Sequence, residues 1–111
     1  LKLKEVCAIQ AEAFSSAEFV HGPVALAQKP LKVLSLGLFD ESQATHQQQV
    51  DDVTERGAHV LNMKVFPDNV HPRLGALMVM QRFYLDIADI SVQLGCNPDT
   101  PQGLNKVTMT V

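Results

Sequence analysis

Long apolar runs and clustered positive charge are both missing from this sequence of 111 residues. No apolar run approaches the roughly 20 residues of a membrane-spanning helix, and no charged start followed by an apolar stretch and a small-residue cleavage site is present. The nine Lys and Arg residues are scattered, and the formal net charge is −3. Because nucleic acids and anionic membranes attract clustered positive charge, we expect neither as a partner and expect a cytoplasmic protein.

The residue patterns that mark metal or cofactor sites are also absent. Cys7 and Cys96 lie far apart and match no metal-ligand spacing, so we predict reduced thiols that serve in packing. No pair of the four histidines has metal-site spacing, and His46, His59 and His71 are interpreted as polar surface residues. Gly-rich phosphate-binding motifs are missing too. We therefore predict no metal and no cofactor.

The composition that is present is that of one globular domain, with 46% hydrophobic and 19% charged residues. Apolar residues at spacings of three and four predict a helix over Leu1 to Glu18. A break at His21-Gly22-Pro23 precedes a short helix that ends near Gln28. The sequence begins without Met or a capping residue, so we expect a piece of a longer protein.

Strands and helices alternate in the rest of the chain. Val33 to Phe39 is a nearly continuous apolar run, typical of a parallel strand that is buried on both faces. Asp40 is the predicted N-cap of an outer helix that ends at Gly57. Three residues of that helix are expected to be buried: Ala44, Val50 and Val53. A peripheral strand over 58–65, a helix over 73–94 and a tail over 96–111 follow.

This order of elements predicts the α/β class, with a doubly wound, three-layer (αβα) parallel sheet. Sheets commonly have about five or six strands, and only two are predicted here. We therefore expect residues 1–111 to be the C-terminal part of one domain, with 96–111 as an ordered tail.

Four polar side chains are candidates for chemistry, and each has two interpretations. Glu5 with Lys2, three residues before it, is a surface ion pair or a general base that moves a proton between adjacent carbons of an open-chain sugar. His21 is a polar turn residue or the group that opens a sugar ring. Lys106 lies in a disordered terminus, or in an ordered tail where it holds an anion or attacks a carbonyl.

The spacing of Glu5 and His21 constrains any shared role. A continuous helix of sixteen residues would place them about 24 Å apart, which is too far for one hexose to touch both. Either the chain folds back after Phe19, or the two residues serve different active sites that a neighbouring subunit or domain completes. We favour the second interpretation.

Four stretches together resemble a known family. They are Leu1-Lys2-Leu3-Lys4-Glu5, Ala11-Glu12-Ala13-Phe14, Glu18-Phe19-Val20-His21-Gly22-Pro23 and Gly103-Leu104-Asn105-Lys106-Val107-Thr108. They resemble the C-terminal sugar isomerase (SIS) domain of the glucosamine-6-phosphate synthase and deaminase group, over nearly the whole chain.

The resemblance implies roles for individual residues. Glu5 matches the isomerising base, His21 the ring-opening histidine supplied across a subunit contact, and Lys106 the tail lysine that meets the carbonyl end of the sugar. Lys2 and Asn105 match residues near the substrate. The phosphate-binding loops of the family lie upstream of the matched region, so we expect the isolated chain to bind substrate poorly.

The tail decides between members of the group. The synthases typically end in Pro-Arg-Asn-Leu-Ala-Lys-Ser-Val-Thr, whereas this chain has Gln102, Gly103 and no Ser after Lys106. We therefore expect a phosphosugar isomerase, most specifically a deaminase that converts glucosamine 6-phosphate to fructose 6-phosphate and ammonia, acting as a homodimer. The alternatives are the isomerase domain of glutamine-fructose-6-phosphate aminotransferase and a non-catalytic sugar-phosphate sensor.

Overall fold

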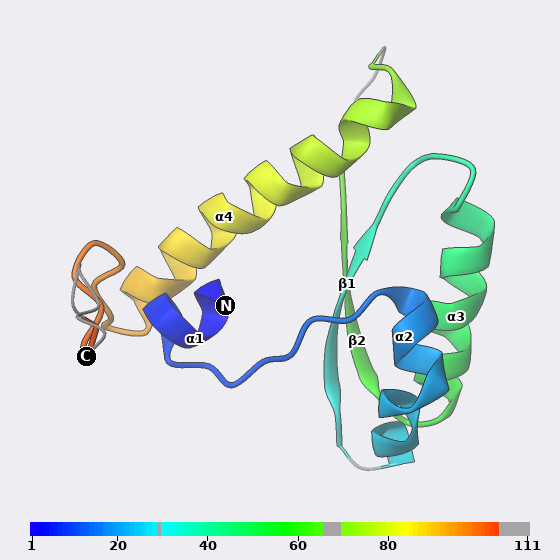
Figure 1. The fold of residues 1–111 in the computed structure, drawn as a ribbon, viewed down its shortest axis with the longest axis horizontal. Coiled ribbons are helices and arrows are strands. Elements are labelled where there is room, and N and C mark those ends of the chain that lie inside the picture. The colour runs from blue at the N-terminus through cyan, green and yellow to red at the C-terminus, as the bar shows by residue number, and fades with distance from the viewer. Residues whose placement is uncertain (29, 66–69, 105–111) are drawn as a thin grey trace, which may run out of the picture. The chain divides into compact units, whose positions relative to one another are not determined.

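The computed structural model describes residues 1–28, 30–65 and 70–104 (Figure 1). The chain divides into two compact units. The first unit combines Leu1–Glu12 with Phe83–Val111, and the second unit is Ala13–Arg82. The elements in chain order are α1 (Lys2–Cys7), α2 (Ser16–His21), the 3-10 helix η1 (Pro23–Gln28), β1 (Lys32–Gly37), α3 (Gln43–Glu55), β2 (His59–Lys64), the 3-10 helix η2 (Pro72–Leu74) and α4 (Gly75–Gln93).

The second unit is built on a two-stranded parallel sheet. β1 pairs with β2 in a register that runs from Lys32 opposite His59 to Gly37 opposite Lys64, and α3 connects the two strands. Both predicted strands are confirmed to within two residues at each end. The α/β class and the parallel pairing are confirmed as well, and a parallel sheet flanked by helices is consistent with part of a SIS-type fold.

One face of this sheet forms the core of the second unit. Ala27, Val53 and Ala58 are buried there, and five half-buried residues pack against them: Phe19, Val24, Leu31, Val33 and Val60. These side chains come from α2, η1, α3 and the strands, so the helices cover this face (Figure 1).

The prediction that β1 is buried on both faces is wrong. Its burial alternates along the strand, because the helices that form the core pack on one side only. Leu34 and Leu36 are 37% and 36% exposed, and Leu61, which pairs with Leu34, is 65% exposed. The apolar residues of β1 therefore lie on two faces, one covered by the helices and one exposed.

The predicted continuous helix over Leu1 to Glu18 is also wrong. Helix α1 ends at Cys7, where Ala8 adopts a left-handed conformation (φ 54°) and the Ile9 N–H donates to the Leu3 carbonyl at 2.9 Å. The apolar spacing of three and four continues past this stop, and for that reason it predicted one helix.

A new helix, α2, begins after a capping box. The Ser15 hydroxyl accepts from the Glu18 N–H at 3.2 Å, and the Glu18 carboxylate accepts from the Ser15 N–H at 2.8 Å. Ser followed three residues later by Glu is the sequence signature of this cap. It was the signal that could have predicted the interruption.

The outer helix α3 begins later than predicted. Its N-cap is Ser42, whose N–H and hydroxyl donate to the Asp40 carboxylate at 2.9 and 2.6 Å, so Asp40 stabilises the turn before the helix. Val50 and Val53 are buried as predicted, but Ala44 is exposed. It lies in the first turn, away from the Val53 core cluster.

The first unit is held by packing of α1 on α4. Val6, Cys7 and Ile87 are buried together, and Leu3 and Phe83 pack against them. Helix α4 begins two residues later than predicted, after η2. Among residues 1–28, 30–65 and 70–104, no helix combines the length and apolar character needed to cross a membrane.

Candidate functional site

The Lys2 and Glu5 side chains meet on α1, as their spacing predicted. The Lys2 Nζ lies 2.8 Å from Glu5 Oε2, and the Glu5 side chain is the less exposed of the two, at 25% against 46%. A carboxylate at this position can act as a general base, and an ammonium group beside it can stabilise developing negative charge. The geometry is therefore compatible with proton transfer.

The pair also has a defined electrostatic character. The hydrogen bond to Glu5 raises the pKa of Lys2, and the negative charge of Glu5 raises it further. Tyr84 on α4 makes a smaller contribution in the same direction. Lys2 is therefore a cation throughout the neutral pH range.

Helix α1 is fixed in place by buried contacts that lie close to this pair. The Ser91 hydroxyl, which is fully buried, donates to the Val6 carbonyl at 2.6 Å. The Cys7 thiol donates to the Ile87 carbonyl at 3.7 Å. Because α1 has only six residues, these contacts rather than its own backbone bonds set the position of Glu5.

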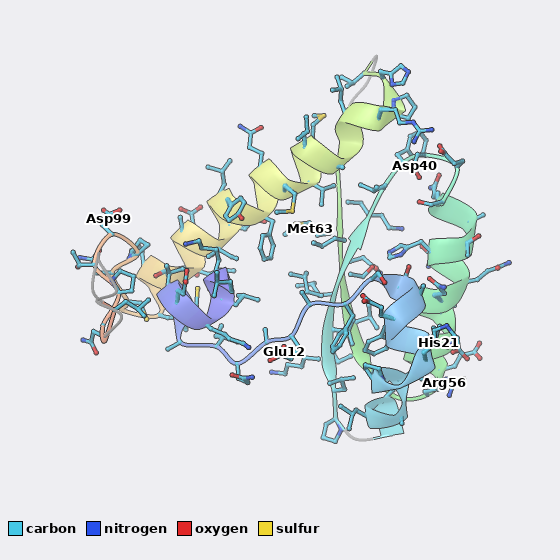
Figure 2. The ribbon with its side chains drawn as sticks, in the orientation of Figure 1. Glu12, His21, Asp40, Arg56, Met63 and Asp99 are labelled. Carbon is cyan, nitrogen blue, oxygen red and sulfur yellow. The ribbon has the colours of Figure 1, made fainter. Side chains whose placement is uncertain are left out.

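A second ion pair follows the end of α1. The Lys4 Nζ lies 2.6 Å from Glu12 Oε1, and this hydrogen bond lowers the pKa of Glu12. Both side chains are more than a third exposed, and Glu12 lies in the segment between α1 and α2 (Figure 2). Glu12 thus forms the same kind of ion pair as Glu5 but is more exposed, so substitution of Glu12 is a useful control for substitution of Glu5.

His21 lies in the second unit. It is the last residue of α2, is exposed, and precedes Gly22, as its place in a helix-ending turn predicted (Figure 2). The separation of about 24 Å from Glu5 assumed a continuous helix, and α1 and α2 do not form one. The structure thus brings Lys2 and Glu5 together and places His21 in the other unit.

The other two predicted site residues, Asn105 and Lys106, lie outside the described residues. The segment before them forms a turn in which the Leu104 N–H donates to the Pro101 carbonyl at 3.4 Å. Gly103 has a φ of 78° in this turn, a conformation that favours glycine. The Gly103 that distinguishes this tail from the synthase pattern therefore has a backbone role.

One polar pair was missed from the sequence. His46 was interpreted as a surface residue, but its Nε2 lies 2.8 Å from the hydroxyl of Ser35, which is buried in β1. A buried hydroxyl requires a hydrogen-bond partner, so a Ser within an apolar strand was a usable signal. His59 and His71 are exposed, as predicted. In the part of the chain that the structure describes, no cluster of His, Cys, Asp or Glu could hold a metal.

Comparisons with known proteins give a consistent result. The chain is 33% identical over 117 residues to the glutamine–fructose-6-phosphate aminotransferase (isomerizing) of Bacillus licheniformis, 32% over 117 residues to that of Streptococcus mutans, and 29% over 120 residues to that of Clostridium acetobutylicum. Each alignment covers 96% of this chain. The chain spans about a fifth (19–20%) of the length of these relatives. No protein-family model matches the chain.

Proposed function

We propose that the chain is part of the isomerase domain of a glutamine–fructose-6-phosphate aminotransferase. The similarity to these enzymes over 96% of the chain carries the proposal. The reaction converts fructose 6-phosphate to glucosamine 6-phosphate, with glutamine as the nitrogen donor. The isomerase step moves a proton between the first two carbons of the open-chain sugar.

The paired side chains on α1 suit this step. Glu5 moves the proton as the general base, and the Lys2 ammonium, 2.8 Å from it, stabilises the negative charge that develops on the sugar oxygens. His21 opens the sugar ring, Lys106 meets the carbonyl end of the sugar, and Asn105 lies near the substrate. We further propose that the sites are shared between the subunits of a homodimer, with His21 acting across the contact.

A deaminase is the second candidate. Gln102, Gly103 and the absence of Ser after Lys106 favour it, because they depart from the synthase tail. The relatives favour the aminotransferase, since each of those cited carries that name. A sugar-phosphate sensor is less favoured, because Glu5 and Lys106 are both present and a sensor needs neither.

An assay of the intact protein with two substrate sets separates these candidates. The aminotransferase is expected to form glucosamine 6-phosphate from fructose 6-phosphate only when glutamine is supplied. The deaminase would instead release fructose 6-phosphate and ammonia from glucosamine 6-phosphate without glutamine. Binding of either sugar phosphate without turnover in both assays would contradict an enzyme and favour the sensor.

A further inference from the structure

The two cysteines of the chain converge on the same stretch of α4 in the first unit. The buried Cys7 thiol contacts the Ile87 carbonyl at 3.7 Å, and the Cys96 N–H donates to the Ser91 carbonyl at 2.9 Å. Ile87 and Ser91 are one helical turn apart on the same face of α4. The Ser91 hydroxyl also bonds to the carbonyl of Val6, the residue before Cys7. Ser91 therefore links the backbones that carry the two cysteines.

The two thiols lie in different environments. Burial raises the pKa of the Cys7 thiol, and the charge of Cys96 raises it further. Both thiols are free. Cys96 is only partly buried, whereas Cys7 is 3% exposed. Of the two, Cys96 is the one that a small reagent in solution reaches first.

We propose that Cys7 and Cys96 form a reversible disulfide by exchange with a low-molecular-weight disulfide such as glutathione disulfide. The Cys96 thiolate attacks one sulfur of that reagent, forms a mixed disulfide and releases one glutathione thiolate. Cys7 then loses its proton and attacks the Cys96 sulfur, which releases the second glutathione. The protein loses two protons and two electrons, and glutathione disulfide gains them and is reduced to two thiols.

This bond would regulate the proposed site, a consequence that rests on the proposed function. Cys7 is the last residue of α1 and lies two residues after Glu5, while Cys96 begins the segment that leads to Lys106. The disulfide takes the Cys7 sulfur away from the Ile87 carbonyl, and we expect the end of α1 to shift with it. Because small displacements of catalytic groups are costly, we expect the oxidised protein to be about tenfold or more slower.

The test combines thiol counting with mass spectrometry on the intact protein. After incubation with glutathione disulfide and alkylation of the remaining thiols, the expected product is a Cys7–Cys96 linked peptide pair that dithiothreitol separates. The Cys96→Ala variant should keep an unmodified Cys7, because Cys7 is buried. Cys96 is partly exposed, so we expect the Cys96→Ala variant to fold, and circular dichroism checks that it does. In the Cys7→Ala variant, the reaction should end at a glutathione adduct on Cys96, because the Cys7 thiol is no longer present to displace the glutathione.

Each outcome decides a separate part of the proposal. Alkylation of both Cys7 and Cys96, or a stable glutathione adduct on Cys96 in the wild type, would overturn the disulfide. A disulfide that leaves sugar-phosphate turnover unchanged would overturn its regulatory role. A disulfide in a protein without turnover in either redox state would refute the proposed function and leave the thiol chemistry intact, since thiol counting does not depend on activity.

Discussion

The two units of the molecule hold their helices in different ways. In the second unit, α3 connects two strands whose backbones pair in register over six residues, and Val53 of α3 lies in the buried cluster. In the first unit, the six residues of α1 depend on a few side-chain contacts with α4, eighty or more positions away in the sequence. The candidate catalytic pair thus lies on a short helix whose position depends on its contacts with α4.

This comparison implies that damage to the α1–α4 contact should be local. The largest effect is expected for Ile87→Ala, because Ile87 is 3% exposed at the centre of that contact. Loss of this side chain should lower the free energy of unfolding by about 2–5 kcal/mol. Hydrogen exchange should then show lost protection of the α1 amides while β1 and β2 stay protected.

The matched control is Ile90→Ala, which removes the same atoms from an α4 residue that is 39% exposed. This variant should lower the free energy of unfolding by about 1 kcal/mol or less. Equal loss of protection in α1 and β1 after Ile87→Ala would break the comparison, since it would mean that the two units unfold together.

The next largest effect is expected at Ser91. In Ser91→Ala the Val6 carbonyl loses the 2.6 Å hydrogen bond from a fully buried hydroxyl. An unsatisfied buried acceptor costs about 1–3 kcal/mol. Chemical denaturation should detect this loss, whereas Ser16→Ala, at an exposed position of α2, should change stability by no more than about 0.5 kcal/mol. A cost at Ser91 no larger than at Ser16 would mean that this bond does not fix α1.

A smaller effect of opposite sign is expected at the end of α1. Ala8 is the one non-glycine residue with a positive φ in the described part of the chain. A left-handed conformation costs an L-residue about 1–2 kcal/mol, part of which glycine recovers. Ala8→Gly should therefore raise the melting temperature, while Ala13→Gly, outside this conformation, should not. A lower melting temperature for Ala8→Gly would show that Ala8 is unstrained.

The smallest effect concerns the cap of α2 in the second unit. The Ser15 N–H and then the Ser15 hydroxyl lower the pKa of Glu18 by hydrogen bonding to its carboxylate. Because the folded-state pKa is the lower one, this stabilisation is present above the ordinary Glu pKa and is lost as pH falls through the folded value.

Glu18→Gln should therefore be less stable than wild type at neutral pH, and the difference should vanish in acid. Denaturation curves at both pH values measure it. Glu55→Gln makes the same charge change near the end of α3, away from any helix N-terminus, and serves as the control. A difference for Glu18→Gln that persists in acid would contradict a role for the ionised carboxylate.

The sequence predicted the local features of the fold better than the long-range ones. Val33 to Phe39 is a short apolar run, and the stretch over 58–65 is one that polar residues interrupt. Each contains one of the two parallel strands. The spacing of Lys2 and Glu5 predicted their contact, because residues three positions apart on a helix are neighbours on its surface. The sequence did not predict the end of α1, because helical periodicity gives no sign of a residue in the left-handed conformation, such as Ala8.

The contacts that support the candidate site could not be predicted from spacing. Ser91 and Val6 are 85 positions apart, and no local pattern connects a serine hydroxyl with one particular carbonyl. The pairing of Ser35 with His46 has the same origin, because it depends on how α3 packs on β1. The roles of Glu5, His21 and Lys106 come from the resemblance, and they stay predictions.

The central claim is that Glu5 moves a proton on a sugar phosphate. The most direct test is incorporation of solvent deuterium into fructose 6-phosphate by the intact protein, compared for wild type, Glu5→Gln and Glu12→Gln. We expect Glu5→Gln to slow incorporation at least about 100-fold, and Glu12→Gln, which removes the more exposed carboxylate, to leave it near the wild-type rate. Wild-type incorporation by a folded Glu5→Gln protein would contradict the account.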